Sequence, residues 1–252
     1  MIKKLLEILK DQNIIYEKNV SLKEKTWLKR GGTAKLWIQP ENKDMLLFII
    51  RFLYDNHINF EIVGNTSNCY FTENYDPIVI ISTLKVCDFE INNGTLICGC
   101  GYNLKKLSKF CIENGIAGYE GFIGIPGTVG GAAINNSGAR GYVISQVVTR
   151  VEIVTTSGKI KWIGNNQLGY KHRYSTLKSL RVKGTVLSVE FDISRRDDKS
   201  VMLKKAENYL IHRRVNQENK YLNLGSIFSE LDLFKNKRSL RFKLFTISKR
   251  VT

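Results

Sequence analysis

Residues 121–141 read GFIGIPGTVGGAAINNSGARG, and glycine takes seven of these twenty-one places, at positions 121, 124, 127, 130, 131, 138 and 141. Because glycine inside a helix costs about 1 kcal/mol relative to alanine, regular structure gains nothing from this composition. The stretch predicts a loop whose backbone lies in close contact with a ligand or with another backbone segment. A run of small residues from Gly130 onward could enter a helix N-terminus and meet a pyrophosphate, and a tight crossover that packs backbone against backbone is the alternative.

Two further segments could line the same site. The loop GNTSNCYF (64–71) directly follows the expected strand 59–63, and its small residues could form a phosphate nest or a plain strand-to-turn connection. The segment TWLKRGGTA (26–34) could be another wall of the pocket or an ordinary bulge. The GxGxxG dinucleotide fingerprint, which needs a preceding strand and a later acidic residue, does not match residues 121–141.

The composition narrows the class of protein. The chain has 252 residues, 43% of them hydrophobic, and a formal net charge of +16. Lys and Arg are spread along the whole chain without a nucleic-acid-binding motif, so an anionic small molecule explains part of the excess better than a nucleic acid. Five cysteines without a CxxC pair and three scattered histidines predict reduced thiols and no metal site. The amphipathic N-terminus and the interrupted apolar run MLLFIIRFLY (45–54) predict a cytoplasmic protein without a membrane span.

The order of apolar patterns predicts a mixed α+β fold. Helical periodicity appears at residues 42–55, 103–114 and 199–214. Short β-branched runs predict strands at residues 35–40, 59–63, 77–82, 95–99, 148–155, 159–163 and 186–193. Because strands and helices do not alternate regularly, a βαβ arrangement is not expected. The charged stretch 192–201 is the expected boundary before the last helix. Residues 229–252 hold seven Lys or Arg and two acidic residues, and this pattern is compatible with a terminal helix, a strand pair, an anchoring tail or a disordered end.

Taken in order, TWLKRGGTA, GNTSN, GYEGFIGIPGTVGGAAINNSGARG, RYSTLK and GSIF resemble the UDP-N-acetylenolpyruvoylglucosamine reductase (UDP-N-acetylmuramate dehydrogenase) family over about residues 15–228. The resemblance implies an α+β, two-subdomain FAD-binding fold of the vanillyl-alcohol-oxidase type. Its subdomains would span residues 1–82 and 83–196, followed by an incomplete substrate region at 197–252. The implied enzyme is monomeric, uses FAD and NADPH, and reduces UDP-N-acetylglucosamine enolpyruvate to UDP-N-acetylmuramate in peptidoglycan precursor synthesis. A partner could bind the basic residues 229–252.

The resemblance also implies specific site residues. FAD would lie between the two subdomains, held by Gly64, Asn65, Thr66, Ser67, Asn68, Gly124, Ile125, Pro126, Gly127, Thr128, Gly130, Gly131, Asn136 and Gly138. Arg173, which matches the R-x-S motif, would hold the substrate carboxylate and stabilise the enediolate. Ser226, which matches GS-x-F, would donate the proton to C2. From the residues alone, Arg173 could equally be one more surface base and Ser226 a turn serine.

Three departures from the family pattern bear on which substrate the protein uses. The family continues after GS-x-F with Lys-Asn-Pro and a closing region that ends in a catalytic glutamate, whereas SELDLFKNK follows here and Glu230 is too near Ser226 for that role. His172 stands where the family has Tyr, with Tyr170 two places earlier. The short spacing after RYSTLK matches members that lack the extra substrate-binding loop. Two alternatives therefore stand beside the reductase: a relative that acts on another nucleotide sugar in surface polysaccharide synthesis, and a non-catalytic flavin-binding protein.

Overall fold

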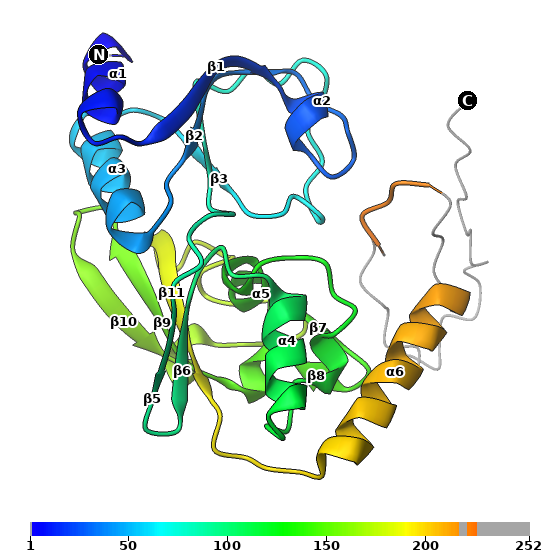
Figure 1. The fold of residues 1–252 in the computed structure, drawn as a ribbon. Helices are drawn as coiled ribbons and strands as arrows, with labels where there is room; N and C mark the ends of the chain where they lie inside the picture. Colours follow the sequence, from blue (N-terminus) through cyan, green and yellow to red (C-terminus); the bar gives the residue numbers. More distant parts are fainter. Residues whose placement is uncertain (1, 217–220, 226–252) are drawn as a thin grey trace, which may run out of the picture.

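The structure is a computed structural model that describes residues 2–216 and 221–225. Its N-terminal part forms a four-stranded sheet in the order β1-β2-β4-β3 (Figure 1). β1 (Ile15–Ser21) pairs antiparallel with β2 (Thr33–Gln39), while β4 (Val79–Ser82) runs parallel to both β2 and β3 (Glu61–Val63). All four residues of β4 are buried, as expected for a short apolar strand between two parallel neighbours. The loop that begins at Gly64 therefore starts at the edge of the sheet where β4 also ends.

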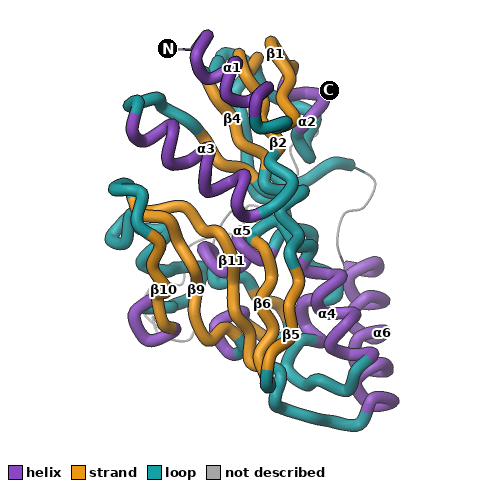
Figure 2. The backbone as a smooth tube through the Cα atoms, turned by 60° about the vertical axis from the view of Figure 1, so that its left-hand side comes forward, coloured by secondary structure: helices purple, strands orange, loops and turns teal. Residues whose placement is uncertain are grey.

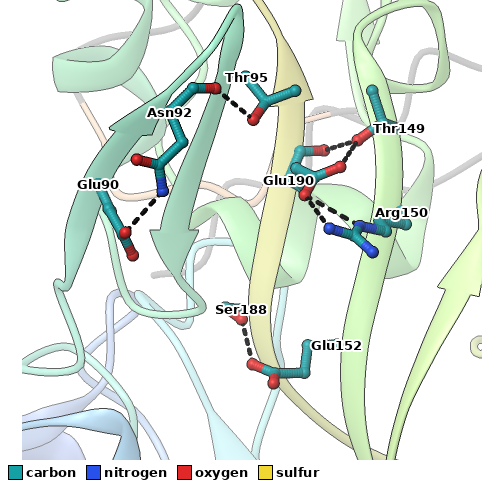
Figure 3. Close-up of polar contacts among 8 residues, drawn as sticks. All are labelled: Glu90, Asn92, Thr95, Thr149, Arg150, Glu152, Ser188 and Glu190. Carbon is teal, nitrogen blue, oxygen red and sulfur yellow. Dashed lines mark hydrogen bonds and ion pairs between the residues drawn. The ribbon is translucent and has the colours of Figure 1, made fainter.

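A second sheet of five antiparallel strands follows in the chain, in the order β10-β9-β11-β6-β5 (Figure 1). Its strands are β5 (Phe89–Asn92), β6 (Thr95–Gly99), β9 (Val148–Thr155), β10 (Ile160–Gly164) and β11 (Gly184–Asp192). The central strand β11 is buried at seven of its nine residues, with only its two ends less enclosed. One face of this sheet carries polar side chains that pair across neighbouring strands, such as Glu190 with Arg150 and Glu152 with Ser188 (Figure 3).

The helix α3 (Lys43–Asp55) lies between the two sheets, as Figure 2 shows. Asn42 caps its N-terminus by accepting a hydrogen bond from the Met45 amide at 2.9 Å, and the helix buries Leu46, Ile49, Ile50 and Leu53 at helical spacing. Its Lys43 ammonium lies 3.3 Å from the Glu152 carboxylate of β9, and its Arg51 donates to the Gly158 carbonyl at 2.9 Å. The largest hydrophobic cluster includes side chains of α3 and of both sheets, so the two sheets share one core.

The helices α4 (Leu104–Glu113), α5 (Val129–Asn135) and α6 (Lys199–Asn216) belong to the part of the molecule that holds the second sheet (Figures 1 and 2). α4 and α5 follow β6, and α6 runs beside α4. The smaller elements are α1 (Ile2–Asp11), α2 (Leu22–Lys25), the 3-10 turns Glu120–Phe122, Ile144–Gln146 and Asn165–Leu168, and the short hairpin of β7 (Gly138–Ala139) and β8 (Tyr142–Val143). Within the described ranges, no helix is long and apolar enough to cross a membrane.

The element predictions are confirmed, but the strands β1 and β5 and the short elements α2, β7 and β8 are not predicted. The expected helices correspond to α3, α4 and α6, and the seven expected strands correspond to β2, β3, β4, β6, β9, β10 and β11. β1 and β5 are missed because they carry little buried apolar pattern: all four residues of β5 are exposed, and β1 buries only Val20. The subdomain limits at residues 82 and 196 stay a prediction, and residues 229–252 lie outside the described part of the chain.

Candidate cofactor site

Two loops meet where the parts of the molecule that hold the two sheets adjoin. Gly64–Asn68 follows β3, and Gly124–Thr128 precedes α5. The Ser67 hydroxyl donates a hydrogen bond to the Pro126 carbonyl, which joins the loops directly. A methyl group at Gly64 would lie only 2.6 Å from the Thr128 hydroxyl oxygen, so position 64 requires glycine. The structure thus brings together two of the three segments that the sequence singles out, although they lie about sixty residues apart.

The glycines of residues 121–141 divide into two groups by what surrounds them. A methyl group at Gly130 would lie 2.8 Å from the Cys100 Cβ, and Gly121 and Gly138 are likewise pressed against neighbouring backbone. These positions match the backbone-packing interpretation. At Gly127, by contrast, the nearest atom to such a methyl group is the Ser67 hydroxyl oxygen at 3.8 Å. Protein packing therefore explains Gly130, and it leaves Gly127 unexplained.

The two loops present backbone amides suited to an anion. Among the described residues, no protein acceptor receives the amide hydrogens of Asn65, Ser67 or Gly127, all of which lie outside helices and strands. Backbone amides without protein acceptors in such loops can form nests that bind phosphate oxygens. The following helix α5 spans only seven residues, so these amides, and not a helix dipole, make the loop suitable for a diphosphate.

Thr66 connects the third predicted segment to the site. It is buried, with a backbone φ of 51°, and its hydroxyl accepts a hydrogen bond of 2.7 Å from the Trp27 amide. Trp27 belongs to the TWLKRGGTA segment, in which the Thr26 hydroxyl donates to the Arg30 carbonyl at 2.8 Å. The segment thus packs against the Gly64–Asn68 loop, as the pocket-wall alternative requires.

The loop scaffold rests on buried groups beneath it. Thr128 caps α5 by accepting a hydrogen bond from the Gly131 amide at 3.3 Å, and the Leu104 amide donates to the Gly127 carbonyl at 3.0 Å. Cys100 lies against Gly130, where burial, opposed in part by a hydrogen bond from Thr83, raises the pKa of its thiol to about 12. Cys100 is therefore a protonated, space-filling side chain at neutral pH and not a nucleophile.

Asn136 and Gly138 position the candidate catalytic arginine. The buried Asn136 side chain donates to the Lys171 carbonyl at 2.9 Å and accepts from the Ser145 amide at 3.2 Å, so both ends of its amide are bonded within the protein. The Gly138 carbonyl accepts a hydrogen bond of 3.0 Å from Arg173 Nη2. Arg173 has a left-handed backbone with φ of 53°, which costs a non-glycine residue roughly 1 kcal/mol or more. Ser226 lies outside the described residues.

Ser82 is a site residue that the sequence reasoning missed. It ends β4 in register with Val63, immediately before the Gly64 loop begins on the neighbouring strand. Its side chain is 1% exposed, and its hydroxyl has no hydrogen-bond partner among the described residues. Burying a hydroxyl without a hydrogen-bond partner costs about 1–3 kcal/mol of stability, and a hydrogen bond to a bound ligand could recover that cost. The available signal was a hydroxyl residue at the end of the apolar strand PIVIIS (77–82).

Comparisons with known proteins identify the family. Residues 34–164, which include both loops, match the family model described as "FAD binding domain". The chain is 34% identical over 211 residues to the UDP-N-acetylenolpyruvoylglucosamine reductase of Carboxydothermus hydrogenoformans, which covers 83% of this chain and 69% of that protein. It is 32% identical over 220 residues to the enzyme of the same name from Caldicellulosiruptor saccharolyticus, covering 87% and 71% of the two chains.

Solved structures share the fold. The crystal structure of UDP-N-acetylenolpyruvylglucosamine reductase from Thermus caldophilus aligns with a TM-score of 0.71 at 24% identity, over 86% of this chain and 76% of that one. A berberine bridge enzyme variant aligns with a TM-score of 0.58 at 13% identity, over 77% and 44%. These likenesses establish the two-subdomain, vanillyl-alcohol-oxidase-type fold. The relatives show that the chain belongs to the UDP-N-acetylenolpyruvoylglucosamine reductase family, and together with the FAD-binding domain they show that it is an FAD-dependent oxidoreductase.

Proposed function

We propose that this protein catalyses the NADPH-dependent reduction of UDP-N-acetylenolpyruvoylglucosamine to UDP-N-acetylmuramate, a step of peptidoglycan precursor synthesis. The relatives bear the name of that enzyme. The observation that carries the proposal is the junction at which Ser67 bonds to Pro126 and Gly64 lies against Thr128, because it brings together the two loops that are proposed to hold a diphosphate.

The chain's own residues fit FAD at this junction. Gly64–Asn68 and Gly124–Gly131 would hold its diphosphate through the amides of Asn65, Ser67 and Gly127. Asn136 and Gly138, which bond to Lys171 and Arg173, would lie close by. When bound, FAD would supply the redox chemistry that couples NADPH to the enolpyruvyl group. The protein's own residues would then orient the enolpyruvyl carboxylate and deliver one proton to the substrate.

Arg173 is suited to the carboxylate. Reduction of an enol ether conjugated with a carboxylate places negative charge on that carboxylate, so a guanidinium aimed at it stabilises the transition state more than the ground state. One Arg173 nitrogen is fixed on the Gly138 carbonyl, and the Lys178 ammonium donates to the Arg173 carbonyl at 2.9 Å, which holds the strained backbone in place. The guanidinium has five N–H donors, so others remain for a ligand.

Ser226 would deliver the proton to C2. An alcohol is a weak acid, but an enediolate is a strong base and needs a proton from one face. The chain spans about 70% of the length of the curated relatives that it matches.

The reaction can be tested directly with purified protein, FAD and NADPH. NADPH oxidation that requires UDP-N-acetylenolpyruvoylglucosamine, with UDP-N-acetylmuramate identified by mass spectrometry, is the expected result. The same assay with NADH tests the nicotinamide preference. Bound FAD with NADPH oxidation only on other nucleotide sugars would contradict the proposal in favour of a diverged relative, and bound FAD without reduction by either nicotinamide would favour a non-catalytic flavoprotein.

A further inference from the structure

α6 presents one face to the rest of the molecule. Met202 and Ala206 are buried against Ile112 of α4 and against Ile123, and the ring of Tyr209 packs edge-on against Tyr142 with centroids 6.1 Å apart. Further along the same face, at the spacing expected of a helix, comes Arg213. The packing of the first two turns therefore fixes where the Arg213 side chain can reach.

That side chain lies against the Gly124 backbone. A methyl group at position 124 would fall 2.9 Å from Arg213 Cδ and 3.7 Å from both Nε and Nη1. The stem and the guanidinium of Arg213 thus run alongside the loop Gly124–Thr128, from the side of α6. A side chain at position 124 would therefore have to displace Arg213 from its present place beside the loop.

The Arg213 guanidinium has no counter-charge in the described structure. Burial lowers its pKa, and no neighbouring carboxylate acts against that effect. Among the residues described, none accepts a hydrogen bond from it or forms an ion pair with it; the Glu120 carboxylate beneath α6 instead lies 4.0 Å from Lys205. A partly buried cation without a partner is costly, whereas the same cation beside an anion-binding loop is stabilised when the anion binds.

We propose that Arg213 binds the diphosphate group of the ligand that occupies the Gly124–Thr128 loop. The backbone amides would contact the phosphate oxygens from the loop, and the guanidinium would add a charge-assisted, two-pronged contact from α6. Two sources could present this chemistry, FAD and the nucleotide sugar of the proposed reaction. The assignment of this diphosphate to the nucleotide sugar rests on the proposed function, and its assignment to FAD rests only on membership of the family.

Two titrations separate these sources. Apoprotein is titrated with FAD by flavin fluorescence, and the FAD-loaded protein is titrated with UDP by the change in flavin absorbance. Three variants are compared with the wild type: Arg213→Gln keeps the stem against Gly124 and removes the charge, Arg213→Lys keeps the charge and loses the fork, and Lys204→Ala removes a cation from the exposed face of the same helix. Thermal unfolding of each apoprotein confirms that α6 is folded.

Arg213→Gln is expected to raise Kd for one of the two ligands by about ten- to a hundredfold, as for other lost hydrogen bonds to charged groups. Arg213→Lys should lose less, and Lys204→Ala should change either Kd by less than about threefold because an exposed charge is screened. A loss confined to FAD assigns Arg213 to the cofactor, and a loss confined to UDP assigns it to the nucleotide sugar. Folded Arg213→Gln protein that binds both ligands as tightly as Lys204→Ala would overturn the inference, whereas wild type that fails to bind FAD would overturn the proposed function.

Discussion

At the scale of single residues, the glycine-rich stretch 121–141 serves two physical purposes. Gly130 is needed because the backbone of α5 passes against Cys100, and this need exists with or without a ligand. At Gly127 an added methyl group would make only an ordinary contact with the Ser67 hydroxyl oxygen, at 3.8 Å, and the Gly127 amide has no acceptor among the described residues. The distinction separates residues that build the loop from residues proposed to touch the cofactor.

Substituting these two glycines should give opposite results. Gly130→Ala should lower the free energy of unfolding of the apoprotein by about 1–3 kcal/mol, because the new methyl group overlaps Cys100. Gly127→Ala should leave that free energy unchanged within about 0.5 kcal/mol and weaken FAD binding by about tenfold or more. Urea unfolding and FAD titration measure both quantities, and unchanged FAD affinity in a folded Gly127→Ala protein would refute the proposed contact.

The role of Arg173 makes a separate prediction at this scale. Arg173→Ala should leave the rate of flavin reduction by NADPH within a few-fold of wild type and slow the subsequent reoxidation by the enolpyruvyl sugar by about a hundredfold or more, as for other lost oxyanion donors. Arg181→Ala is the matched control, since it removes an exposed cation from the same loop. Equal losses in both half-reactions would show that Arg173 has only a structural role.

Ser226 should behave differently from both. Ser226→Ala removes the proposed proton donor, so NADPH should still reduce the flavin while turnover of the enolpyruvyl sugar is lost. Rapid-reaction kinetics on each half-reaction provide the measurement. Loss of both half-reactions would contradict the role assigned to this residue.

At the scale of elements, the second sheet is held together on its polar face by charge pairs between β9 and β11 (Figure 3). Glu190 accepts hydrogen bonds from Arg150 Nε at 2.9 Å and Nη2 at 2.6 Å, and from the Thr149 hydroxyl at 2.6 Å. The Arg150 guanidinium also stacks on Trp162, 4.4 Å from the ring centre. These contacts connect three neighbouring strands on the face opposite α5.

This cluster should make stability depend on pH. Burial raises the pKa of Glu190, but the hydrogen bonds from Arg150 and Thr149 outweigh burial, so the net pKa is lower in the folded protein. A carboxyl group with a lowered pKa stabilises the fold above its unfolded pKa of about 4.3, and this contribution disappears as the pH falls through the folded value. Because Arg150 is half exposed, the contribution is about 1–2 kcal/mol.

Chemical unfolding of Glu190→Gln at two pH values tests this. The variant should be less stable than wild type by that amount at pH 7, and the difference should shrink as the pH falls below the unfolded pKa of about 4.3 and the wild-type carboxyl becomes protonated. Glu113→Gln is the control, since its ion pair with Lys109 is exposed and 3.7 Å long, and it should shift stability by less than about 0.5 kcal/mol at either pH. A deficit that is the same at both pH values would mean that charge is not the cause.

At the scale of the whole molecule, the site exists only where the two sheets meet. α3 shares its apolar core with both sheets and is fastened to the second by Lys43 and Arg51. This fixed junction lets a hydroxyl on the first loop, Ser67, reach a carbonyl on the second, Pro126. The Trp27 indole also donates to the Asn223 carbonyl at 2.9 Å, so the segment after α6 contacts the first subdomain beside the same site.

The sequence predicts what is local and misses what is distant. The periodicity of α3, α4 and α6 and the apolar runs of the buried strands identify those elements, because burial acts on neighbouring residues. β5 exposes all its residues and therefore gives no such signal. The positions of Ser82 and Arg213 depend on strand pairing and on how α6 packs, and neither is encoded in nearby residues. Residue types indicate the two candidate anion-binding loops, and only the tertiary structure shows that these loops touch.

A double-mixing stopped-flow experiment on the FAD-loaded protein tests the proposed function most directly. Anaerobic mixing with NADPH should bleach the flavin absorbance, and a second mixing with UDP-N-acetylenolpyruvoylglucosamine should restore it with formation of UDP-N-acetylmuramate. Flavin that NADPH reduces but the enolpyruvyl sugar leaves reduced would contradict the proposed reaction.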